Sequence, residues 1–331
     1  MHRFLLLLII VVLNQIVSAH PAYGIVMDHQ GNLYFTDIMH NGRGTLWKLD
    51  KNKKLTAVLK NFHAHNVNVD SGGNIYSAHG EDTHTLIRIA ASGSIDTLIM
   101  TEDMTEFFGG SCTVSPDGQI YFGIDKKVWL WTPEGNRAIN AQDLKWNQGF
   151  YVDENETIYA TDIGRGAGGS LVEIRKDGTS HIIAEHLIDV GDRDFDPTSE
   201  VLLGVNKDEE GNLYVADLGG KRIAQITPEG IVKTHYQSGS DWNPSGIFIN
   251  EGEEYILEIG NDGQGPRIIK KVGSTTEVYF DYATHHNHPQ VFTRPGGMKI
   301  PWQLIAIFFP VLVYAIYQSR NKRSQGLTKA V

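Results

Sequence analysis

The sequence predicts an all-β fold, a six-bladed β-propeller of four-stranded antiparallel blades, and three observations carry this prediction. A pattern that ends in tyrosine recurs six times at intervals near forty residues. Between its copies, short apolar runs alternate with clusters of turn-forming residues. The chain also contains 35 glycines, which suits a protein with many tight turns because glycine adopts positive φ angles without steric cost.

The recurring pattern is an apolar run, an aspartate or similar turn residue, a glycine, a leucine or isoleucine, and a tyrosine, and the fourth and sixth copies follow it only in part. The copies read VMDHQGNLY, VNVDSGGNIY, TVSPDGQIY, YVDENETIY, NKDEEGNLY and FINEGEEY. Their tyrosines are Tyr34, Tyr76, Tyr121, Tyr159, Tyr214 and Tyr255, at successive intervals of 42, 45, 38, 55 and 41 residues. A period near forty that consists of strands is typical of propeller blades. The long fourth interval predicts an extra loop from about Ala184 to Leu203.

The first copy shows how one blade is expected to form. Apolar residues in 24–27 and 33–37 follow strand patterns, and 28–31 (DHQG) has the composition of a hairpin turn. Two further strands are expected at 45–49 and 55–59. A four-stranded blade cannot bury both of its faces alone, so the blades must stack on one another and close a ring.

The segments DHQGNLYFTD (28–37) and DEEGNLYVADLGGKRIAQITPEG (208–230) resemble the NHL-repeat and SMP-30/gluconolactonase-like group of six-bladed propellers. The resemblance covers residues ~22 to 281, at the expected length per repeat. The signatures of Trp-Asp and kelch repeats, the rival propeller families, are not evident. The resemblance implies a divalent ion in the channel, held by Glu, Asn and Asp. This sequence departs from that set, with Ala-Tyr-Gly at 22–24, Asn-Gln-Gly at 147–149 and Pro-Ser-Gly at 244–246.

Two apolar segments flank the predicted propeller domain, 20–283. Residues 1–19 have the pattern of a signal peptide cleaved after Ala19, with an uncleaved anchor as the alternative. Residues 300–317 are long and apolar enough to cross a bilayer, and the basic tail 318–331 predicts a cytoplasmic C-terminus. The alternative for 300–317 is a buried helix of a soluble protein. The favoured interpretation is a single-pass type I membrane protein whose propeller is extracellular or periplasmic, with a juxtamembrane linker at 284–299.

Polar residues are expected to converge at one rim of the channel, where the innermost strands begin and the second strands end. The positions that end the second strands are Asp37, His79, Ile124, Asp162, Asp217 and Glu258. The positions that begin the inner strands are Tyr23, His65, Asn66, Gln148, Asn206 and Ser245. An aspartate at such a place often caps its own loop, and this is the favoured interpretation of the three aspartates.

His65, His79 and Glu258 form the candidate metal site. Two histidines and a carboxylate can hold Zn²⁺ or another divalent ion, and Ca²⁺ is a second candidate. Such an ion would support hydrolysis of a lactone or ester, or a lyase step. The alternative is a pair of hydrogen-bonded rim histidines without metal.

Other candidates carry weaker signals. The loop 192–196 (DRDFD) has alternating carboxylates, but a solvated acidic loop is favoured over a calcium site. His285, His286 and His288 are interpreted as linker residues, and Cys112, the single cysteine, as a buried core residue that can form no internal disulfide. If cleavage follows Ala19, His20 becomes the mature N-terminus and a weak copper candidate.

Two functions remain in view. The first is a membrane-anchored module that binds a small molecule or partner protein through its rim loops and channel. The second is a metal-dependent hydrolase or lyase of the gluconolactonase-like kind. A net charge of −10 argues against nucleic acid as a partner, and no Walker, HExxH, GxSxG or CxxC motif is present.

Overall fold

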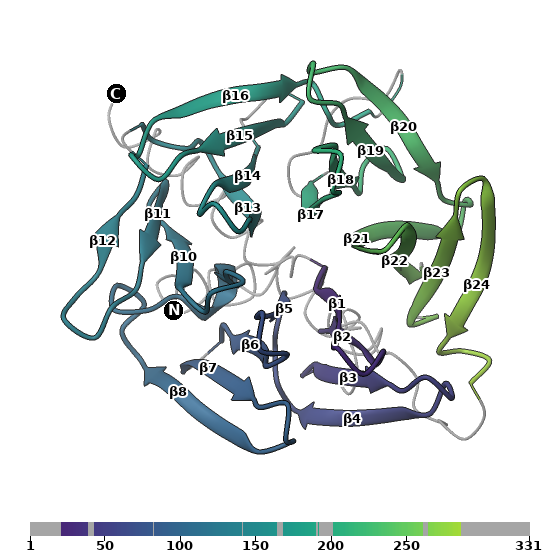
Figure 1. Cartoon of the computed structure of the whole chain (residues 1–331), viewed down its shortest axis with the longest axis horizontal. Coiled ribbons are helices and arrows are strands. Elements are labelled where there is room, and N and C mark those ends of the chain that lie inside the picture. The colour runs from purple at the N-terminus through teal and green to yellow at the C-terminus, as the bar shows by residue number, and fades with distance from the viewer. Residues whose placement is uncertain are drawn as a thin grey trace, which may run out of the picture. The chain divides into compact units, whose positions relative to one another are not determined.

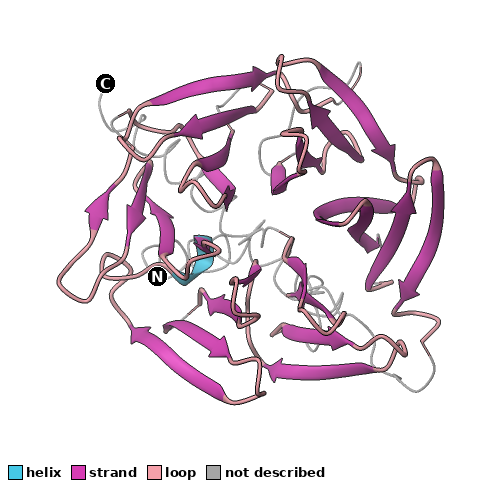
Figure 2. Ribbon diagram, in the orientation of Figure 1, coloured by secondary structure: helices cyan, strands magenta, loops and turns pink. Residues whose placement is uncertain are grey.

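The structure is a computed structural model that describes residues 21–38, 43–81, 83–140, 142–163, 168–189, 191, 201–260 and 264–285. Within these residues the chain forms six sheets, each of four antiparallel strands, set radially around a common axis (Figure 1). Apart from one short 3₁₀ turn, at Gly109–Ser111, the described elements are strands (Figure 2). The predicted six-bladed propeller with four-stranded blades is confirmed.

Each of the first three blades takes its strands from one continuous stretch of chain. Blade 1 contains β1 (Ile25–Met27), β2 (Leu33–Asp37), β3 (Thr45–Leu49) and β4 (Leu55–Lys60). Blade 2 contains β5 (Val67–Val69), β6 (Ile75–His79), β7 (His84–Ile89) and β8 (Ile95–Thr101). Blade 3 contains β9 (Cys112–Val114), β10 (Ile120–Ile124), β11 (Lys127–Leu130) and β12 (Arg137–Ala138). The strands predicted for the first blade agree with the observed ones to within one residue.

The last three blades repeat this arrangement. Blade 4 contains β13 (Asn147–Val152), β14 (Ile158–Asp162), β15 (Ser170–Ile174) and β16 (Ser180–Glu185). Blade 5 contains β17 (Leu202–Lys207), β18 (Leu213–Asp217), β19 (Arg222–Ile226) and β20 (Val232–Gln237). Blade 6 contains β21 (Trp242–Asn250), β22 (Glu253–Gly260), β23 (Pro266–Val272) and β24 (Thr275–Asp281). The predicted long loop thus lies between β16 and β17, and most of it is outside the described residues.

A hydrogen bond explains why the repeat pairs an aspartate with a tyrosine. In blade 2, Asp70 accepts backbone N–H bonds from Gly72 and Asn74, which shapes the turn between the first two strands. The hydroxyl of Tyr76 donates to the other carboxylate oxygen over 2.9 Å. The corresponding bond in blade 5 is also 2.9 Å long. In these two blades the bond fixes the start of the second strand to the hairpin.

The ring closes where blade 6 packs against blade 1. Phe35 and Phe280 lie 5.7 Å apart between ring centroids, and Trp47 and Tyr282 lie at the same distance. These four side chains belong to one buried cluster shared by the two blades. Since each sheet is built from its own continuous segment, closure depends on packing between faces rather than on an exchanged strand. Cys112 is buried, as predicted.

Several predictions concern parts of the chain outside the described residues. These are the signal peptide 1–19, His20, the loop 192–196, His286 and His288, the rest of the linker, the apolar segment 300–317 and the tail 318–331. By contacts the chain divides into Met1–Arg294 and Pro295–Val331, and the second unit lies wholly outside the description. Among the helices of the described residues, none has the length and apolar character needed to cross a membrane.

Candidate functional site

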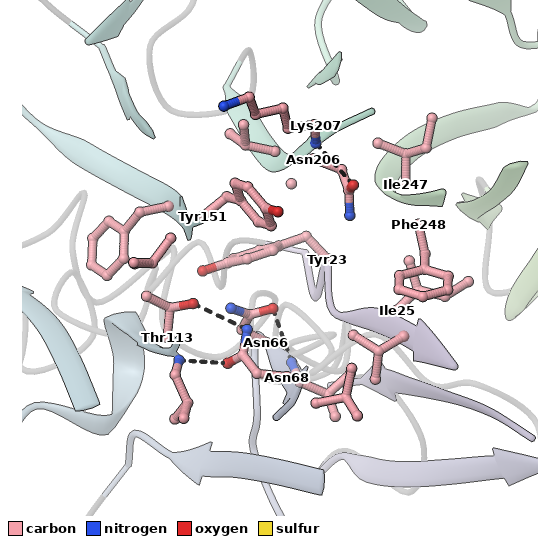
Figure 3. Close-up of a pocket in the computed structure, with 18 of the residues that line it drawn as sticks. Tyr23, Ile25, Asn66, Asn68, Thr113, Tyr151, Asn206, Lys207, Ile247 and Phe248 are labelled. Carbon is pink, nitrogen blue, oxygen red and sulfur yellow. Dashed lines mark hydrogen bonds between the residues drawn. The ribbon is translucent and has the colours of Figure 1, made fainter. Parts of the chain in front are cut away.

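A pocket of about 240 Å³ lies on the propeller axis (Figure 3). All six blades contribute to its wall, each through its innermost strand or the residues next to it. The lining residues extend from Tyr23 to Pro116, Lys207 and Ile249. These last three residues lie in, or next to, the turns between first and second strands. Those turns, called the inner hairpins from here on, are residues 28–32, 70–74, 115–119, 153–157, 208–212 and 251–252. The pocket therefore extends from Tyr23 and Asn66, where inner strands begin, to the inner hairpins.

Tyr23 spans the channel at the inner end of this pocket (Figure 3). Its backbone N–H donates to the carbonyl of His65, and a Cβ added at Gly246 would lie only 2.0 Å from the Tyr23 carbonyl oxygen. Its ring reaches the opposite side, where a Cβ at Gly149 would lie 3.5 Å from Cζ. Glycine is required at 246 because the inner strands of blades 1 and 6 meet backbone to backbone.

A fixed network of amides and a hydroxyl covers one wall of the pocket. Asn68 donates to the hydroxyl of Thr113 over 3.0 Å and accepts from the backbone N–H of Val114. Asn66 donates to the carbonyl of Cys112 and accepts from the N–H of Val67. These bonds tie blade 2 to blade 3. The bonded polar atoms of this wall are therefore used in hydrogen bonds within the protein.

Three other polar groups of the lining form no hydrogen bonds of this kind. The hydroxyls of Tyr23 and Tyr151 form no hydrogen bond to any described residue, and neither does the amide nitrogen of Asn206. The oxygen of the Asn206 amide accepts from the backbone N–H of Lys207, which orients the nitrogen into the channel (Figure 3). Burial raises the pKa of Tyr151 to about 12 and raises that of Tyr23 as well, so both hydroxyls keep their protons at neutral pH.

Lys207 stands at the outer edge of the pocket. Its ammonium donates to Asp153 over 2.9 Å and to the hydroxyl of Tyr159 over 3.0 Å. Burial opposes its charge, but these two bonds outweigh burial and raise the pKa of Lys207. A lysine held so firmly as a cation cannot serve as a neutral amine nucleophile.

Asp37 and Asp162 end their second strands, where they were predicted, and each bonds within its own blade. Asp37 accepts from the indole N–H of Trp47 over 3.2 Å. Asp162 accepts from the backbone N–H groups of Lys145 and Trp146, at 2.9 and 2.6 Å to Oδ1. These partners lie in β3 and in the segment before β13, rather than in the loop that follows each aspartate.

Asp217 ends the second strand of blade 5 and is fully buried. It pairs with Arg222 at 3.0 Å and accepts from the backbone N–H groups of Asp189 and Gly220. Burial raises its pKa, while the backbone bonds and the guanidinium oppose that shift. The carboxylate thus holds together the segment before β17 and the loop after β18.

Glu258 lies within β22 and is also fully buried. Its Oε2 accepts from Nε of Arg267 over 2.5 Å, and its Oε1 accepts from the hydroxyls of Tyr236 and Ser238. Both oxygens of the carboxylate are therefore used inside blades 5 and 6. The Arg267 guanidinium in turn lies over the ring of Trp242.

The two predicted metal-binding histidines lie beside a third one, His63, which the repeat pattern did not point out. The rings of His63 and His65 are 5.0 Å apart, and the backbone N–H of His63 donates to Nδ1 of His79 over 2.8 Å. Burial lowers the pKa of His63, opposed by Glu81 and reinforced by His79. The spacing of the sequence FHAH at 62–65 is the signal that could have found this neighbour.

Sequence counting misplaced Asn206, which was expected where an inner strand begins. The register pairs Asn206 with Tyr214 and Asn68 with Tyr76, so Asn206 is the counterpart of Asn68, near the inner hairpin. Asn206 and Asn68 each stand eight residues before the tyrosine of their copy, whereas Tyr23 stands eleven residues before Tyr34. Tyr23, Asn66 and Asn206 all line the pocket, whereas Ser245 is buried and the side chain of Gln148 lies outside the described residues.

No protein-family model and no curated protein sequence matches this chain. Solved structures do. Virginiamycin B lyase from Staphylococcus aureus matches with a TM-score of 0.52 and 16% identity, over 80% of this chain and 85% of the lyase. A gluconolactonase from Xanthomonas campestris matches with 0.53 and 15%, over 73% and 84%. The calcium-binding protein regucalcin from Agrobacterium tumefaciens matches with 0.54 and 13%, over 80% and 94%. This chain has their six-bladed fold.

The resemblance to gluconolactonase-like propellers is thus confirmed at the level of the fold. A divalent ion is implied by that group, but the residues present do not fit one. Among the described residues, no three histidine, cysteine, aspartate or glutamate side chains gather closely enough to hold a metal ion, so His65, His79 and Glu258 do not form such a set. The amide nitrogen of Asn147 donates to the carbonyls of Gly149 and Thr161, and the amide oxygen accepts from the hydroxyl of Ser111.

Proposed function

We propose that this propeller takes up a small polar molecule in its central channel, from the inner-hairpin side. One observation carries the proposal: two tyrosine hydroxyls and one amide nitrogen, on Tyr23, Tyr151 and Asn206, face the same pocket without partners among the described residues. Unused hydrogen-bonding groups in a partly buried pocket are what a polar ligand requires. The neighbouring amides of Asn66 and Asn68 are held rigidly, so the wall is preorganised.

A small molecule suits this site better than a protein partner at the rim loops. The pocket is narrow, and Tyr23 spans the channel at its inner end. Two of the structural neighbours bear the names of a lyase and a gluconolactonase, both of which act on small molecules. The rim residues Asp37, Asp162 and Asp217 are engaged in bonds within the protein.

The test is a binding screen of the purified full-length chain against neutral sugars, polyols, amines and carboxylic acids. Tyr23→Phe and Tyr151→Phe should each weaken the binding of a hit about three- to tenfold, because each removes one hydrogen bond to the ligand. Neither change removes a bond within the described residues, so stability should hold.

Tyr76→Phe is the matched control, since that hydroxyl bonds Asp70 and does not line the pocket. It should lower the melting temperature and leave the affinity unchanged. Wild-type affinity in both pocket variants would remove the basis of the proposal.

Hydrolysis of a lactone, or a lyase step, is the second candidate. The names of the structural neighbours favour it over simple binding. The described residues offer no three-ligand metal set, so no catalytic step is assigned to an ion. The assay is turnover of glucono-1,5-lactone with and without chelator. Turnover that is lost with chelator and restored by a divalent ion would establish this candidate, and absence of turnover would dismiss it for that lactone.

We further propose that the propeller is displayed outside the cytoplasm, tethered through residues 300–317. The apolar length of that segment, the basic residues after it and the signal-like residues 1–19 support this topology. Protease added to intact cells, or to spheroplasts where an outer membrane is present, should digest the propeller and spare a tag placed after Val331. A propeller that stays protected in both preparations until the cells are lysed would refute the topology.

A further inference from the structure

The inner hairpins that surround the mouth of the pocket are acidic. Together they contain ten aspartate and glutamate residues and no lysine or arginine. Basic residues occur on the outer hairpins between third and fourth strands, such as Lys51 and Lys53 in blade 1. The negative charge is thus concentrated around the axis rather than spread over the whole face.

Most of these carboxylates lack a cationic partner. Asp153 pairs with Lys207, and Glu156 pairs with Lys176. The other eight hairpin carboxylates form no ion pair with any described lysine, arginine or histidine. Lys207 is already paired with Asp153, so carboxylates outnumber unpaired cations among the described residues around the mouth.

The strongest concentration lies between blades 5 and 6. Asp208, Glu209, Glu210 and Glu251 line a cleft of about 490 Å³ there. Three of them, the glutamates, are exposed to solvent. The cleft and the channel pocket share Lys207 and Ile249 in their linings, so the two are adjoining spaces. A molecule seated in the outer part of the pocket therefore lies next to the cleft.

The buried end of the same pocket supplies an independent sign of a ligand. Tyr23 is only 6% exposed, and its hydroxyl points across the pocket without a hydrogen-bond partner among the described residues (Figure 3). The hydroxyl oxygen is accessible from the pocket, so a ligand or water can bond to it there. An acidic surface that only contacts solvent does not by itself account for a tyrosine hydroxyl without a partner at the axis.

We infer that the ligand is a small organic amine that also bears hydroxyl groups. This inference rests on the proposed function and adds the charge of the ligand to it. The hydroxyl end bonds Tyr23, Tyr151 and Asn206 in the channel, and the ammonium lies in the cleft against Glu209, Glu210 and Glu251. Charge-assisted bonds to carboxylates hold such an ammonium, and the acidic mouth concentrates cations and repels anions.

The test uses three probes of one carbon frame: glucosamine, glucose and gluconate. Their affinities for the full-length chain are measured by isothermal titration near about pH 6, where an amine of this kind is protonated. Glucosamine should bind about tenfold more tightly than glucose, gluconate most weakly, and the advantage of glucosamine should shrink as salt screens the carboxylates.

Variants separate this inference from the proposed function. The triple change Glu209→Gln, Glu210→Gln and Glu251→Gln should abolish the advantage of glucosamine and leave the binding of glucose unchanged. A matched control changes three exposed carboxylates away from the mouth, Glu102, Glu134 and Glu229, to glutamine, and it should preserve both affinities. The two triple variants alter the net charge equally. A difference in affinity between them is therefore due to the positions of the changed carboxylates.

Each outcome decides one claim. If glucose or gluconate binds as tightly as glucosamine, or if the mouth variant behaves like its control, the inference fails. In that case a loss of glucose affinity in Tyr151→Phe still supports the proposed function. If none of the three probes binds at about 10 mM, both claims fail for this ligand class.

Discussion

The ion pair between Lys207 and Asp153 joins blade 5 to blade 4 at the edge of the pocket, and its removal gives the sharpest test of how the blades hold together. The lysine side chain is 25% exposed and the aspartate side chain 2% exposed. The ammonium also bonds the hydroxyl of Tyr159. Replacing Lys207 with methionine keeps the apolar stem and leaves a buried carboxylate without its cation.

The size of the effect follows from what remains around Asp153. Loss of one partner of a buried pair costs about 3–5 kcal/mol when the remaining charge is isolated. Here Asp153 keeps backbone N–H bonds from Asn155 and Thr157, at 3.0 and 2.9 Å, and water reaches the lysine side of the pair. We therefore expect Lys207→Met to lower the free energy of unfolding by about 2–3 kcal/mol. Asp153→Asn, which leaves a solvated lysine, should cost about 1 kcal/mol.

The assay is thermal and denaturant unfolding of the two single variants and the double variant. A loss of about 2–3 kcal/mol should lower the melting temperature by about 4–10 °C in a domain of this size. The double variant should be less destabilised than the sum of the single ones, by at least about 1 kcal/mol. Lys176→Met is the control, since its pair with Glu156 is 71% exposed on the lysine side and should be worth less than about 1 kcal/mol. Additive single variants, or a Lys207→Met protein as stable as the control, would refute the reasoning.

Three further outcomes are expected from unfolding measurements. Tyr76→Phe removes the bond to its hairpin aspartate and should cost about 1 kcal/mol, whereas equal stability would show that the repeat tyrosine is not bonded as described. Gly246→Ala places a Cβ 2.0 Å from the carbonyl oxygen of Tyr23 and should disrupt ring closure, while Gly239→Ala, with nothing within 4 Å, should be tolerated; similar melting temperatures for both would contradict the close approach. Burial, with a smaller contribution from another histidine, lowers the pKa of His84, so the unfolded chain takes up its proton first and stability should fall as the pH drops below about 6.5. His84→Leu should lose less stability between pH 7 and 5, and an unchanged pH profile would argue against a neutral buried ring.

Much of the fold could be predicted because its determinants are local. The turn residue and the tyrosine of a copy act within one hairpin, as Asp70 and Tyr76 show. Strand limits in blade 1 followed from residue patterns that lie within a few positions of each other. The number of blades followed from counting the copies.

The site was harder to predict because its determinants are not local. Tyr23 lies across the channel only because glycines such as Gly246 let neighbouring inner strands meet closely. Asn206 lies near the inner hairpin because the register of β17 and β18 pairs it with Tyr214. Glu258 looked like a metal ligand in the sequence, but its ion pair with Arg267 depends on the register between two strands. These relations appear only when the blades are assembled.

A crystal structure of the full-length chain with its tightest-binding probe is the decisive test of ligand binding in the channel. We expect ligand density on the axis, within hydrogen-bond distance of the Tyr23 and Tyr151 hydroxyls and the Asn206 amide nitrogen, on the inner-hairpin side. Density instead beside His65 and His79, at the opposite end of the channel, with the pocket filled by water alone, would contradict it.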